Sequence, residues 1–556
     1  MSTTAPSSQS RGRRRTRDRD RRLRGTRSTR HDPPVIGTAA DSSPDSSPDS
    51  QEYDVVVVGS GGGALTGAVL AARAGLSVVV LEKTGFLGGT SAYSGGACWL
   101  PGSAVQQRAG LPDSTEAARD YLGAILEGPD EAKVEAFLAH APDLVAELES
   151  DELMDFEWVP FAEYYDAPGR VPGGRSIQPS KIRRDELPEQ VAAWVRPPVE
   201  RDRAGEPGRR TLTGGQALVA RLAAMLVRDG GTVSTGLPVT GLLSEEGPDG
   251  SPKVVGVVGM SPEGPVRVRA RRGVLLGSGG FERNAAVREE HGVPGSAAWT
   301  MAPDGTNTGE PIAAAEAIGA ASDYAGLGWF CPGLEQPDGA GAFTLGFRSG
   351  LMVDQTGRRY GNECLPYDRF GRVMAQAPER IPSWFVFDSR EGGRLPAIAI
   401  PEGDPDARLA AGTWVRADTV ADLAEATGLP VDALTETVER FNGFCSSGVD
   451  EDFGRGEDEY DTFFAGGTGP NKALTPCDQP PYHAARFVLS DLGTKGGLVT
   501  DAAGRVLRKD GKPLLGLYAT GNAAASLFGG VYPGPGAPLG SAMVFASLAV
   551  REMLGA

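Results

Sequence analysis

Two features of this chain have residue types and spacings that point to chemistry: a glycine turn after an apolar strand, and tyrosines in turn-like motifs. Residues 54–64 read Asp-Val-Val-Val-Val-Gly-Ser-Gly-Gly-Gly-Ala. In such a segment Gly59 suits a tight turn, Gly61 lets the backbone approach a pyrophosphate, and Ala64 lets a helix pack closely on the strand. Glu82 lies about 20 residues beyond the turn, where an acid accepts a hydrogen bond from a ribose hydroxyl. The spacing therefore predicts a dinucleotide-binding site.

The elements that must position this turn form a βαβ unit. After the first strand, the pattern predicts a helix of small residues over 65–74 and a second strand over 77–81. The N-terminus of such a helix presents unpaired N–H groups and partial positive charge to phosphates. Further glycine turns follow at residues 277–281 and 516–522, and we expect both to return the chain to the same cofactor. A single nucleotide-binding fold, to which two later glycine turns bring the chain back, favours a permanently held, non-covalent FAD over an exchangeable NAD.

The loop at residues 88–96 and the last helix, predicted over 539–554, complete the expected cofactor site. The loop is dense in Gly, Ser and Thr, which supply small hydroxyls and bare backbone for the ribityl and ring region of a flavin. The N-terminus of the last helix would stabilise negative charge on a reduced flavin through its dipole. The predicted cofactor-binding residues are Gly59, Gly61, Gly62, Gly63, Ala64, Glu82, Lys83, Gly88, Gly89, Thr90, Ser91, Ser94, Gly95, Gly279, Gly280, Gly521, Asn522, Pro538 and Leu539.

The predicted fold class is α/β: a Rossmann-type FAD-binding domain with an inserted α+β catalytic lobe. We expect a disordered Arg/Ser/Pro-rich tail over 1–50, the first part of the FAD-binding domain over 51–325, the catalytic lobe over 326–490, and the C-terminal return over 491–556. Periodicity predicts further helices over 114–126, 130–149, 216–228, 419–427 and 431–444, and strands over 232–235, 254–260, 266–270 and 274–276.

Charge and cysteine usage exclude several classes of function. Residues 1–50 contain 11 Arg and 6 Asp and therefore have a net charge of +5. Because the whole chain has a net charge of −17, the remaining residues have a net charge of −22. An acidic body does not favour nucleic acid as a partner. The 5 cysteines form no C-x-x-C pair, which argues against a metal site and suits a cytoplasmic, reducing compartment. No apolar run reaches about 18 residues, so we expect no transmembrane segment.

Tyrosine is the best candidate proton carrier in this chain, because none of the 4 histidines falls in a glycine-rich motif. Tyr164 and Tyr165 are adjacent, Tyr367 follows Asn-Glu-Cys-Leu-Pro, and Tyr532 begins Tyr-Pro-Gly-Pro-Gly. A tyrosine base must overcome a resting pKa of about 10. It therefore needs a coupled partner or a positive field.

At these motifs the chain resembles the 3-ketosteroid Δ1-dehydrogenases, flavoenzymes of the fumarate-reductase-like superfamily. The resemblance runs from about residue 53 to the C-terminus and leaves out only the Arg-rich tail. Its landmarks are residues 59–68, 81–84, 88–95, 100–102, 108–115, 174–177, 329–333, 388–393 and 490–497, and the most discriminating is 532–536.

The resemblance implies FAD-dependent 1,2-desaturation of the A ring of a 3-ketosteroid substrate in steroid degradation. Tyr367 would remove a proton from C2 while flavin N5 takes hydride from C1. Tyr164 would hydrogen-bond to Tyr367 and ease its deprotonation. Tyr532 and the backbone N–H of Gly536 would grip the C3 carbonyl oxygen, in accord with the stabilisation that a developing enolate requires. Because the sequence shows no second nucleotide site, we expect an external electron acceptor such as a quinone to reoxidise the flavin.

Three alternatives stay open at this stage. The first is a 3-ketosteroid Δ4-dehydrogenase, which should lack the Tyr-Pro-Gly-Pro-Gly turn. The second is a fumarate or succinate oxidoreductase, which needs cationic groups and a histidine to hold two carboxylates. The third is a flavin-binding partner or regulator that has lost its chemistry and uses the Arg-rich tail.

Overall fold

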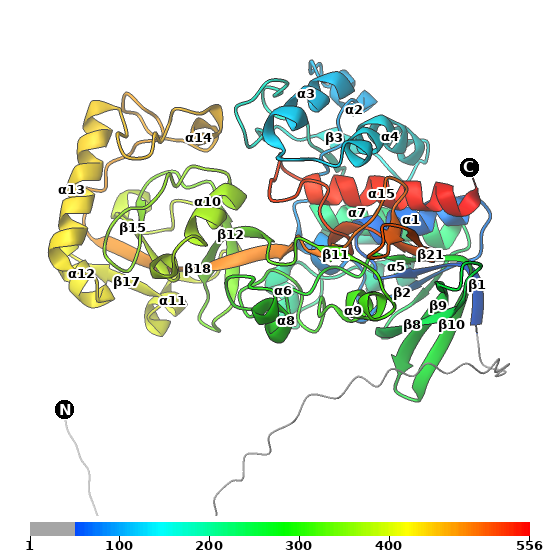
Figure 1. Cartoon of the computed structure of the whole chain (residues 1–556). Helices are drawn as coiled ribbons and strands as arrows, with labels where there is room; N and C mark the ends of the chain where they lie inside the picture. The colour runs from blue at the N-terminus through cyan, green and yellow to red at the C-terminus, as the bar shows by residue number, and fades with distance from the viewer. Residues whose placement is uncertain (1–50, 556) are drawn as a thin grey trace, which may run out of the picture. The chain divides into compact units, whose positions relative to one another are not determined.

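The computed structural model describes residues 51–555, and the first of its two large sheets carries the predicted glycine turns (Figure 1). The strand order is β20-β21-β10-β1-β2-β7. Strands β21, β10, β1, β2 and β7 run parallel, while β8, β9 and the first part of β10 form an antiparallel extension. The bounds are β1 Gln51–Val58, β2 Val78–Leu81, β7 Thr232–Ser234, β8 Val239–Glu246, β9 Pro252–Ser261, β10 Gly264–Leu276, β20 Arg505–Leu507 and β21 Pro513–Ala519.

Strand β1 shows why the valine run at the start of the chain folds as a central strand. Val55 and Val57 lie in one hydrophobic cluster, and Val56 and Val58 lie in another. Successive side chains of a strand point to opposite faces, so both faces of this strand are covered. A parallel strand buried on both faces reads as a continuous apolar run.

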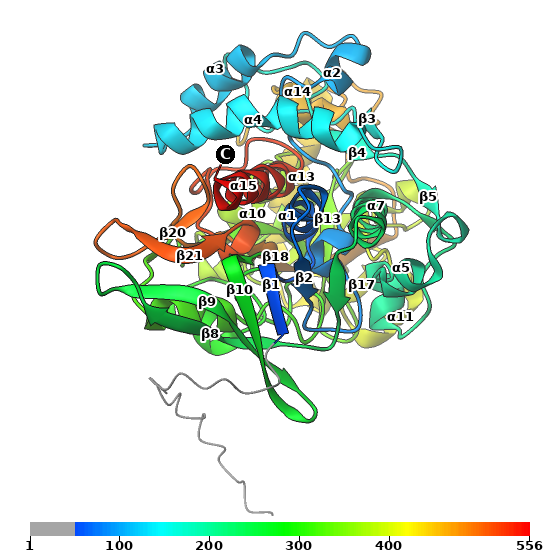
Figure 2. The same cartoon turned by 90° about the vertical axis from the view of Figure 1, so that its right-hand side faces the viewer.

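Helices α1 Gly62–Arg73, α7 Gly214–Arg228 and α15 Ala537–Leu554 cover one face of this sheet, and α4 Glu131–Glu149 lies beyond them (Figure 2). Small residues allow α1 and α15 to approach closely, since a Cβ at Gly63 would lie 2.8 Å from the carbonyl oxygen of Ala542. Within the described residues, α15 is the helix long and apolar enough to cross a membrane, but 67% of it is buried inside the protein. It is thus a core helix.

The second sheet is antiparallel and forms the lobe that contributes the other half of the site. Its strand order is β14-β15-β18-β12-β13-β16, with β17 also paired to β18. The long strand β18, orange in Figure 1, runs from this lobe towards the first sheet. The bounds are β12 Gly328–Glu335, β13 Gly341–Leu345, β14 Leu351–Val353, β15 Ser383–Phe387, β16 Ile398–Ile400, β17 Trp414–Ala417 and β18 Tyr482–Thr494, with helices α10 Tyr367–Met374, α11 Pro405–Ala411, α12 Val420–Thr427, α13 Val431–Ser447 and α14 Glu459–Phe463.

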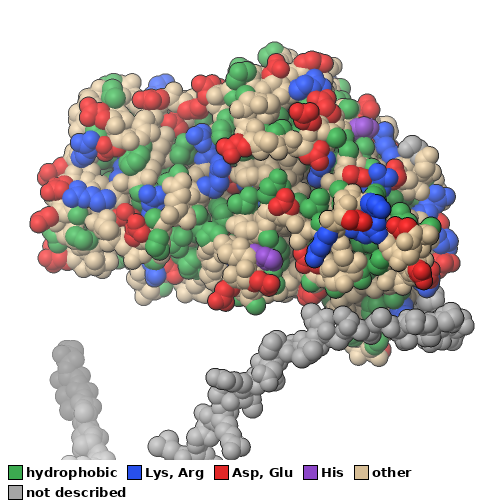
Figure 3. Space-filling view, in the orientation of Figure 1, with side chains coloured by type: hydrophobic (Ala, Val, Ile, Leu, Met, Phe, Trp, Pro, Cys, Tyr) green, Lys and Arg blue, Asp and Glu red, His purple; other side chains and the backbone are tan. Residues whose placement is uncertain are grey.

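The remaining elements are short, and most of them lie between β2 and β12 in the sequence. The helices are α2 Ala104–Arg108, α3 Thr115–Ile125, α5 Glu189–Trp194, α6 Val199–Arg203, α8 Ala285–Glu290 and α9 Glu310–Ala317. The strands are β3 Phe156–Trp158, β4 Ile177–Pro179, β5 Ile182–Arg183, β6 Thr211–Leu212, β11 Ser322–Asp323 and β19 Gly497–Leu498. Side chains of both charges are interspersed over the face shown in Figure 3.

The architecture is the predicted α/β fold with an inserted lobe, although several element boundaries differ. The strands expected over 266–270 and 274–276 are one strand, β10, because both parts pair with β1. Arg271, between them, forms ion pairs with Asp54 and Glu52. Strand β8 was not predicted, since its outer half is polar and exposed. Helix α15 begins at Ala537, two residues before the predicted start. The predicted disordered tail lies outside the described residues, and the domain boundaries stay predictions.

Candidate active site

A cavity of about 550 Å³ lies where the glycine turns of the first sheet meet the second sheet. Most of the predicted site residues line it. They are Gly59, Gly61, Gly62, Gly63, Ala64, Glu82, Lys83, Gly88, Gly89, Thr90, Ser91, Ser94, Gly95, Gly279, Gly521, Asn522, Pro538 and Leu539 of the cofactor set, and Tyr367, Tyr532 and Gly536 of the catalytic set.

Two predicted residues, Gly280 and Tyr164, do not line this cavity. A Cβ at Gly280 would lie 2.0 Å from Oγ1 of Thr494 and 2.6 Å from a carboxylate oxygen of Glu282. Gly280 is therefore required for packing against these two buried side chains, and the structure does not place it in the cofactor cavity.

The first glycine turn has the geometry that its sequence predicts. Gly59 has a φ of +94°, and a Cβ there would lie 2.4 Å from the carbonyl oxygen of Gly277. A Cβ at Gly277 would in turn lie 2.7 Å from the Cβ of Ala64. The backbone N–H of Gly62, in the first turn of α1, donates to Oγ of Ser91 at 3.1 Å. This close packing brings the N-terminus of α1 and the loop at 88–96 to the same side of the cavity.

Glu82 is buried and held in one orientation at the end of β2. Oγ of Ser60 donates to one carboxylate oxygen at 2.5 Å, and the amide and hydroxyl of Thr84 donate to the other at 2.8 and 2.9 Å. The ammonium of Lys83 lies 3.0 Å from Glu310. The orientation of Glu82 at this edge of the cavity suits recognition of a ribose hydroxyl.

The cavity fits FAD by two observations of its lining. A Cβ at Gly89 or Gly95 would meet nothing within 4 Å, so bare backbone faces open space there. Oγ1 of Thr90 and Oγ of Ser278 are buried without a hydrogen-bond partner in the described part of the chain. Buried polar groups normally find a partner, so these two hydroxyls indicate a polar ligand. With the amides of α1 as donors and Glu82 as an acceptor, they form the set of polar groups that an adenine dinucleotide requires.

Three of the predicted tyrosines come together, two of them in the lining of the cavity. The hydroxyl of Tyr367, at the start of α10, donates to the hydroxyl of Tyr532 at 2.9 Å. Their ring centroids are 5.6 Å apart, edge to face. The ring of Tyr164 lies 5.4 Å from that of Tyr367 and 5.2 Å from that of Tyr532. Three segments far apart in the sequence therefore place three phenol rings in mutual contact.

Tyr164 lies next to Tyr367, where the resemblance places it. Within residues 51–555 the Tyr367 hydroxyl donates to Tyr532, and the buried Tyr164 hydroxyl has no other hydrogen-bond partner. A hydrogen bond from Tyr164 nonetheless lowers the pKa of Tyr367 and so acts against the effect of burial. The role expected for Tyr164 in easing the deprotonation of Tyr367 stays a prediction.

Burial makes all three phenols weak acids in this arrangement. Burial raises the pKa of Tyr367 well above its ordinary value, and the neighbouring Tyr532 adds to the shift. Burial likewise raises the pKa of Tyr164 and of Tyr532, although the Tyr367 hydroxyl and the Gly536 amide act in the opposite direction on Tyr532. The phenols are therefore protonated at neutral pH.

The turn that carries Tyr532 and Gly536 is fixed by contacts from several segments. The Tyr121 hydroxyl and the Tyr164 amide donate to the carbonyl oxygen of Pro533 at 2.7 and 3.1 Å. Gly536 has a φ of +84°, and a Cβ there would lie 2.1 Å from the carbonyl oxygen of Ala97. Only glycine fits this conformation and this close approach. These contacts fix the turn. A fixed turn is what the Tyr532 hydroxyl and the Gly536 N–H would need if both are to donate to one substrate oxygen.

Apolar side chains from the lobe form the rest of the cavity wall, and sequence reasoning missed them. The ring of Phe343 lies 4.8 Å from that of Tyr367. Ile398, Ile400 and Phe463 line the cavity and are also between 37% and 39% exposed, so they stand at its mouth. Leu345 and Phe464 of the lobe complete this wall, together with Phe161 from the segment before Tyr164. A flat apolar substrate fits such a surface.

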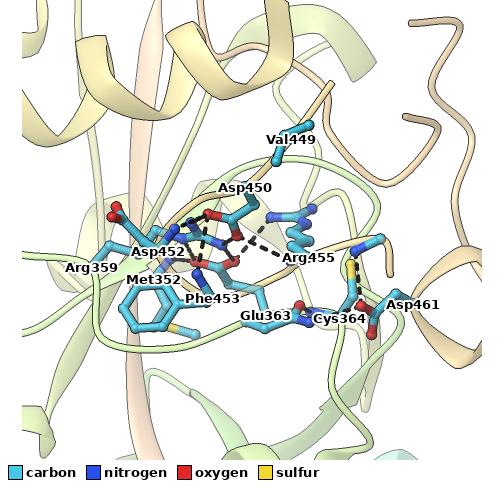
Figure 4. A network of polar contacts seen from close by, with 12 residues as sticks. Met352, Arg359, Glu363, Cys364, Val449, Asp450, Asp452, Phe453, Arg455 and Asp461 are labelled. Carbon is cyan, nitrogen blue, oxygen red and sulfur yellow. Dashed lines mark hydrogen bonds and ion pairs between the residues drawn. The ribbon is translucent and has the colours of Figure 1, made fainter. Parts of the chain in front are cut away.

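A buried ionic network lies next to the segment that delivers Tyr367 (Figure 4). Glu363, four residues before Tyr367, accepts from the amide of Met352 at 2.9 Å, from Arg359 at 2.8 and 2.9 Å, and from Arg455 at 3.1 Å. Arg359 also contacts Asp450 at 2.8 Å. The network ties the loop before α10 to the loop before α14.

We expect the substitution Glu363→Gln to lower the free energy of unfolding by about 3–5 kcal/mol, because it leaves two buried guanidinium groups short of a partner. Denaturant titration of the purified protein measures this change. The matched control is Glu436→Gln, which breaks an exposed ion pair with Arg358 and should cost less than about 1 kcal/mol. Equal losses in the two variants would contradict a stabilising role for the network.

The pH dependence supplies a second check on Glu363. Burial disfavours its charged form, but Arg359 and Arg455 outweigh burial and hold the pKa of Glu363 below its ordinary value. The resulting stabilisation is complete above the unfolded pKa of about 4.5. It is lost as the pH falls through the folded value. The difference between wild type and Glu363→Gln should therefore shrink in acid.

Comparison with known proteins agrees with this geometry. Residues 54–539 match the FAD binding domain family. The chain is 40% identical to a 3-oxosteroid 1-dehydrogenase of Rhodococcus opacus, covering 91% of this chain and 99% of that protein. It is 38% identical to a 3-oxosteroid 1-dehydrogenase of Mycobacterium tuberculosis, covering 90% and 98%. Among solved structures, 3-ketosteroid delta1-dehydrogenase from Sterolibacterium denitrificans in complex with 1,4-androstadiene-3,17-dione superposes with a TM-score of 0.83 at 32% identity, covering 91% and 100%.

Proposed function

Because the chain belongs to the FAD-binding family of 3-oxosteroid 1-dehydrogenases, we propose that it introduces the C1–C2 double bond into 3-ketosteroids. It is an FAD-dependent oxidoreductase of steroid degradation, and its products are 3-keto-1,4-diene steroids. The observation that carries this function is the contact between the hydroxyls of Tyr367 and Tyr532, 2.9 Å apart, in a cavity that is lined both by apolar side chains of the lobe and by the first glycine turn.

We assign proton removal from C2 to Tyr367. A C–H bond beside a ketone becomes acidic only when the developing enolate is stabilised, and Tyr532 with the backbone N–H of Gly536 would supply two donors to that oxygen. Tyr164 packs against both phenol rings and would hold them in place. When bound, FAD supplies the two-electron acceptance that the desaturation requires. The apolar wall from the lobe excludes water and orients the ring system.

Anaerobic mixing of the purified flavoprotein with 4-androstene-3,17-dione tests this function. We expect the flavin absorbance to bleach while the 1,4-diene accumulates, and we expect succinate to leave the spectrum unchanged. The 1,4-diene as product distinguishes C1–C2 desaturation from a Δ4 reaction. An oxidised spectrum that survives the steroid would contradict the proposal and would favour a flavin-binding protein without this chemistry.

We also propose that an external acceptor such as a quinone reoxidises the flavin, and that the protein acts in the cytoplasm. The cytoplasmic proposal is supported by the cysteines, all of which are free and buried. Free thiols without disulfides suit a reducing compartment. Steady-state reoxidation with a soluble quinone in place of an artificial dye would test the first of these proposals.

A further inference from the structure

Lys495 is a buried cation next to the proposed catalytic tyrosines, and the resemblance assigns it no role. It follows Thr494, the last residue of β18, and its side chain is 1% exposed. Its own backbone is fixed, since its N–H donates to the carbonyl oxygen of Leu327 at 2.9 Å and its carbonyl accepts from Ser526 at 3.1 Å. Burial of an unpaired ammonium costs free energy, so the partners of Lys495 indicate which segments it connects.

The partners of Lys495 belong to the two segments that carry the catalytic pair. Its ammonium donates to the carbonyl oxygen of Gly530 at 2.8 Å and lies 3.4 Å from that of Val531, the residue directly before Tyr532. It also lies 3.4 Å from the carboxylate of Asp368, the residue directly after Tyr367. One cation therefore bridges the turn of one tyrosine and the helix of the other.

A tryptophan ring extends this bridge towards Tyr532 and the cofactor region. The ammonium of Lys495 lies 4.4 Å from the ring centroid of Trp329. The Trp329 ring meets the Tyr532 ring edge to face at 4.9 Å, and its indole N–H donates to Asn522 at 3.1 Å. Cation–π and aromatic contacts of this kind restrict the orientation of all three side chains.

We infer that Lys495 is a positioning residue for the proposed desaturation, holding Tyr367 and Tyr532 in register by bridging their two segments. The inference rests on the proposed function, because it assigns no chemistry of its own to the lysine. Lys495 touches neither tyrosine hydroxyl in the contacts described, so it acts through the backbone before Tyr532 and through Asp368.

The charges around Lys495 are arranged so that it can remain an ammonium. Burial lowers the pKa of Lys495 to about 8, and Asp368 opposes that shift. The second oxygen of Asp368 lies 3.2 Å from Arg372, whose guanidinium also donates to the Tyr165 hydroxyl at 2.7 Å. Without Lys495, the Asp368 carboxylate would lose one of its two cations, and α10 would lose its link to the Tyr532 turn.

The test is the substitution Lys495→Met in the FAD-loaded protein, with 4-androstene-3,17-dione as substrate and an artificial electron acceptor. Small displacements of reacting groups cost about 10²-fold in rate, so we expect kcat to fall by about that factor. KM and the affinity for 1,4-androstadiene-3,17-dione, measured by flavin difference spectra, should stay near the wild-type values. The kinetic isotope effect on kcat with steroid deuterated at C2 should increase. Lys495→Arg keeps the charge and should recover part of the loss.

The matched control is Lys133→Met. Lys133 is also buried, donates to Thr500 at 3.1 Å, and lines the same polar cavity of about 30 Å³ as Lys495, but it contacts neither tyrosine segment. We expect this variant to lose stability while its kcat stays near the wild-type value. An equal loss of kcat in both lysine variants, or a loss in Lys495→Met that appears only in KM or in flavin content, would overturn the inference.

A second variant decides the question if Lys495→Met does not retain FAD. Asp368→Asn removes the anchor on α10 and leaves the lysine in place, and we expect it to lower kcat with little change in KM. An unchanged kcat in that variant would also overturn the inference. Failure of the proposed function is distinguishable, since the wild-type protein itself would then yield no 1,4-diene.

Discussion

The substitution Tyr367→Phe is expected to lower kcat by about 10³-fold, within the range that a positioned acid or base contributes. Phenylalanine keeps the ring that packs between Phe343 and Tyr532 but has no hydroxyl to accept the C2 proton. The cofactor end of the cavity is built from other segments. FAD content and steroid affinity should therefore remain close to those of the wild type.

Single-turnover reduction of the flavin by 4-androstene-3,17-dione measures this effect without interference from the electron acceptor. The matched control is Tyr360→Phe, because Tyr360 is also buried and its hydroxyl lies 2.8 Å from that of Ser383, away from the cavity. That variant should reduce its flavin at nearly the wild-type rate. A Tyr367→Phe protein that turns over as fast as Tyr360→Phe would remove Tyr367 from the role of base.

The pH dependence of the wild-type rate follows from the same phenol. Because burial and Tyr532 raise the pKa of Tyr367 well above its ordinary value, the basic form is a minor species at neutral pH. The rate of flavin reduction should increase as the pH rises, since the deprotonated fraction grows. This increase should be absent in Tyr367→Phe.

Local sequence patterns were sufficient to predict the geometry of the first glycine turn. Gly59 and Ala64 are read correctly because a βαβ turn depends on residues close together in the chain, and its steric requirements are the same in every protein that uses it. At Gly280 the close approach is to the side chains of Thr494 and Glu282, so its part in cofactor binding stays a prediction. A glycine alone does not indicate whether its neighbour is a cofactor or a side chain.

The proposed catalytic part of the site depends on contacts between segments that are far apart in the chain. Phe343 and Phe463 come from different elements of the lobe, and each reads in the sequence as an ordinary core residue. Lys495 sits in a recognisable motif, but only the folded chain brings it to Asp368 and to the carbonyls before Tyr532. The hydrogen bond from the Tyr367 hydroxyl to Tyr532 likewise follows from packing and has no signal in the sequence.

The substitution Tyr532→Phe should lower kcat by about 10²- to 10³-fold, the loss typical of one oxyanion-stabilising donor. Tyr532 faces the cavity, and in this arrangement its hydroxyl accepts from Tyr367, so its own proton is available for another acceptor. If that acceptor is the C3 oxygen, the hydrogen bond strengthens as enolate charge develops. The loss should then appear in kcat and kcat/KM together, with KM nearly unchanged.

The split between kcat and KM separates this role from simple substrate binding. A donor that holds the ketone equally well before and during the reaction would raise KM and leave kcat intact. Titration with 1,4-androstadiene-3,17-dione gives an independent measure, because the product carries a neutral carbonyl and should lose much less affinity than the rate loses. Should affinity for the product fall as far as kcat does, Tyr532 would be a binding residue, and stabilisation of the enolate would have to come from the Gly536 amide alone.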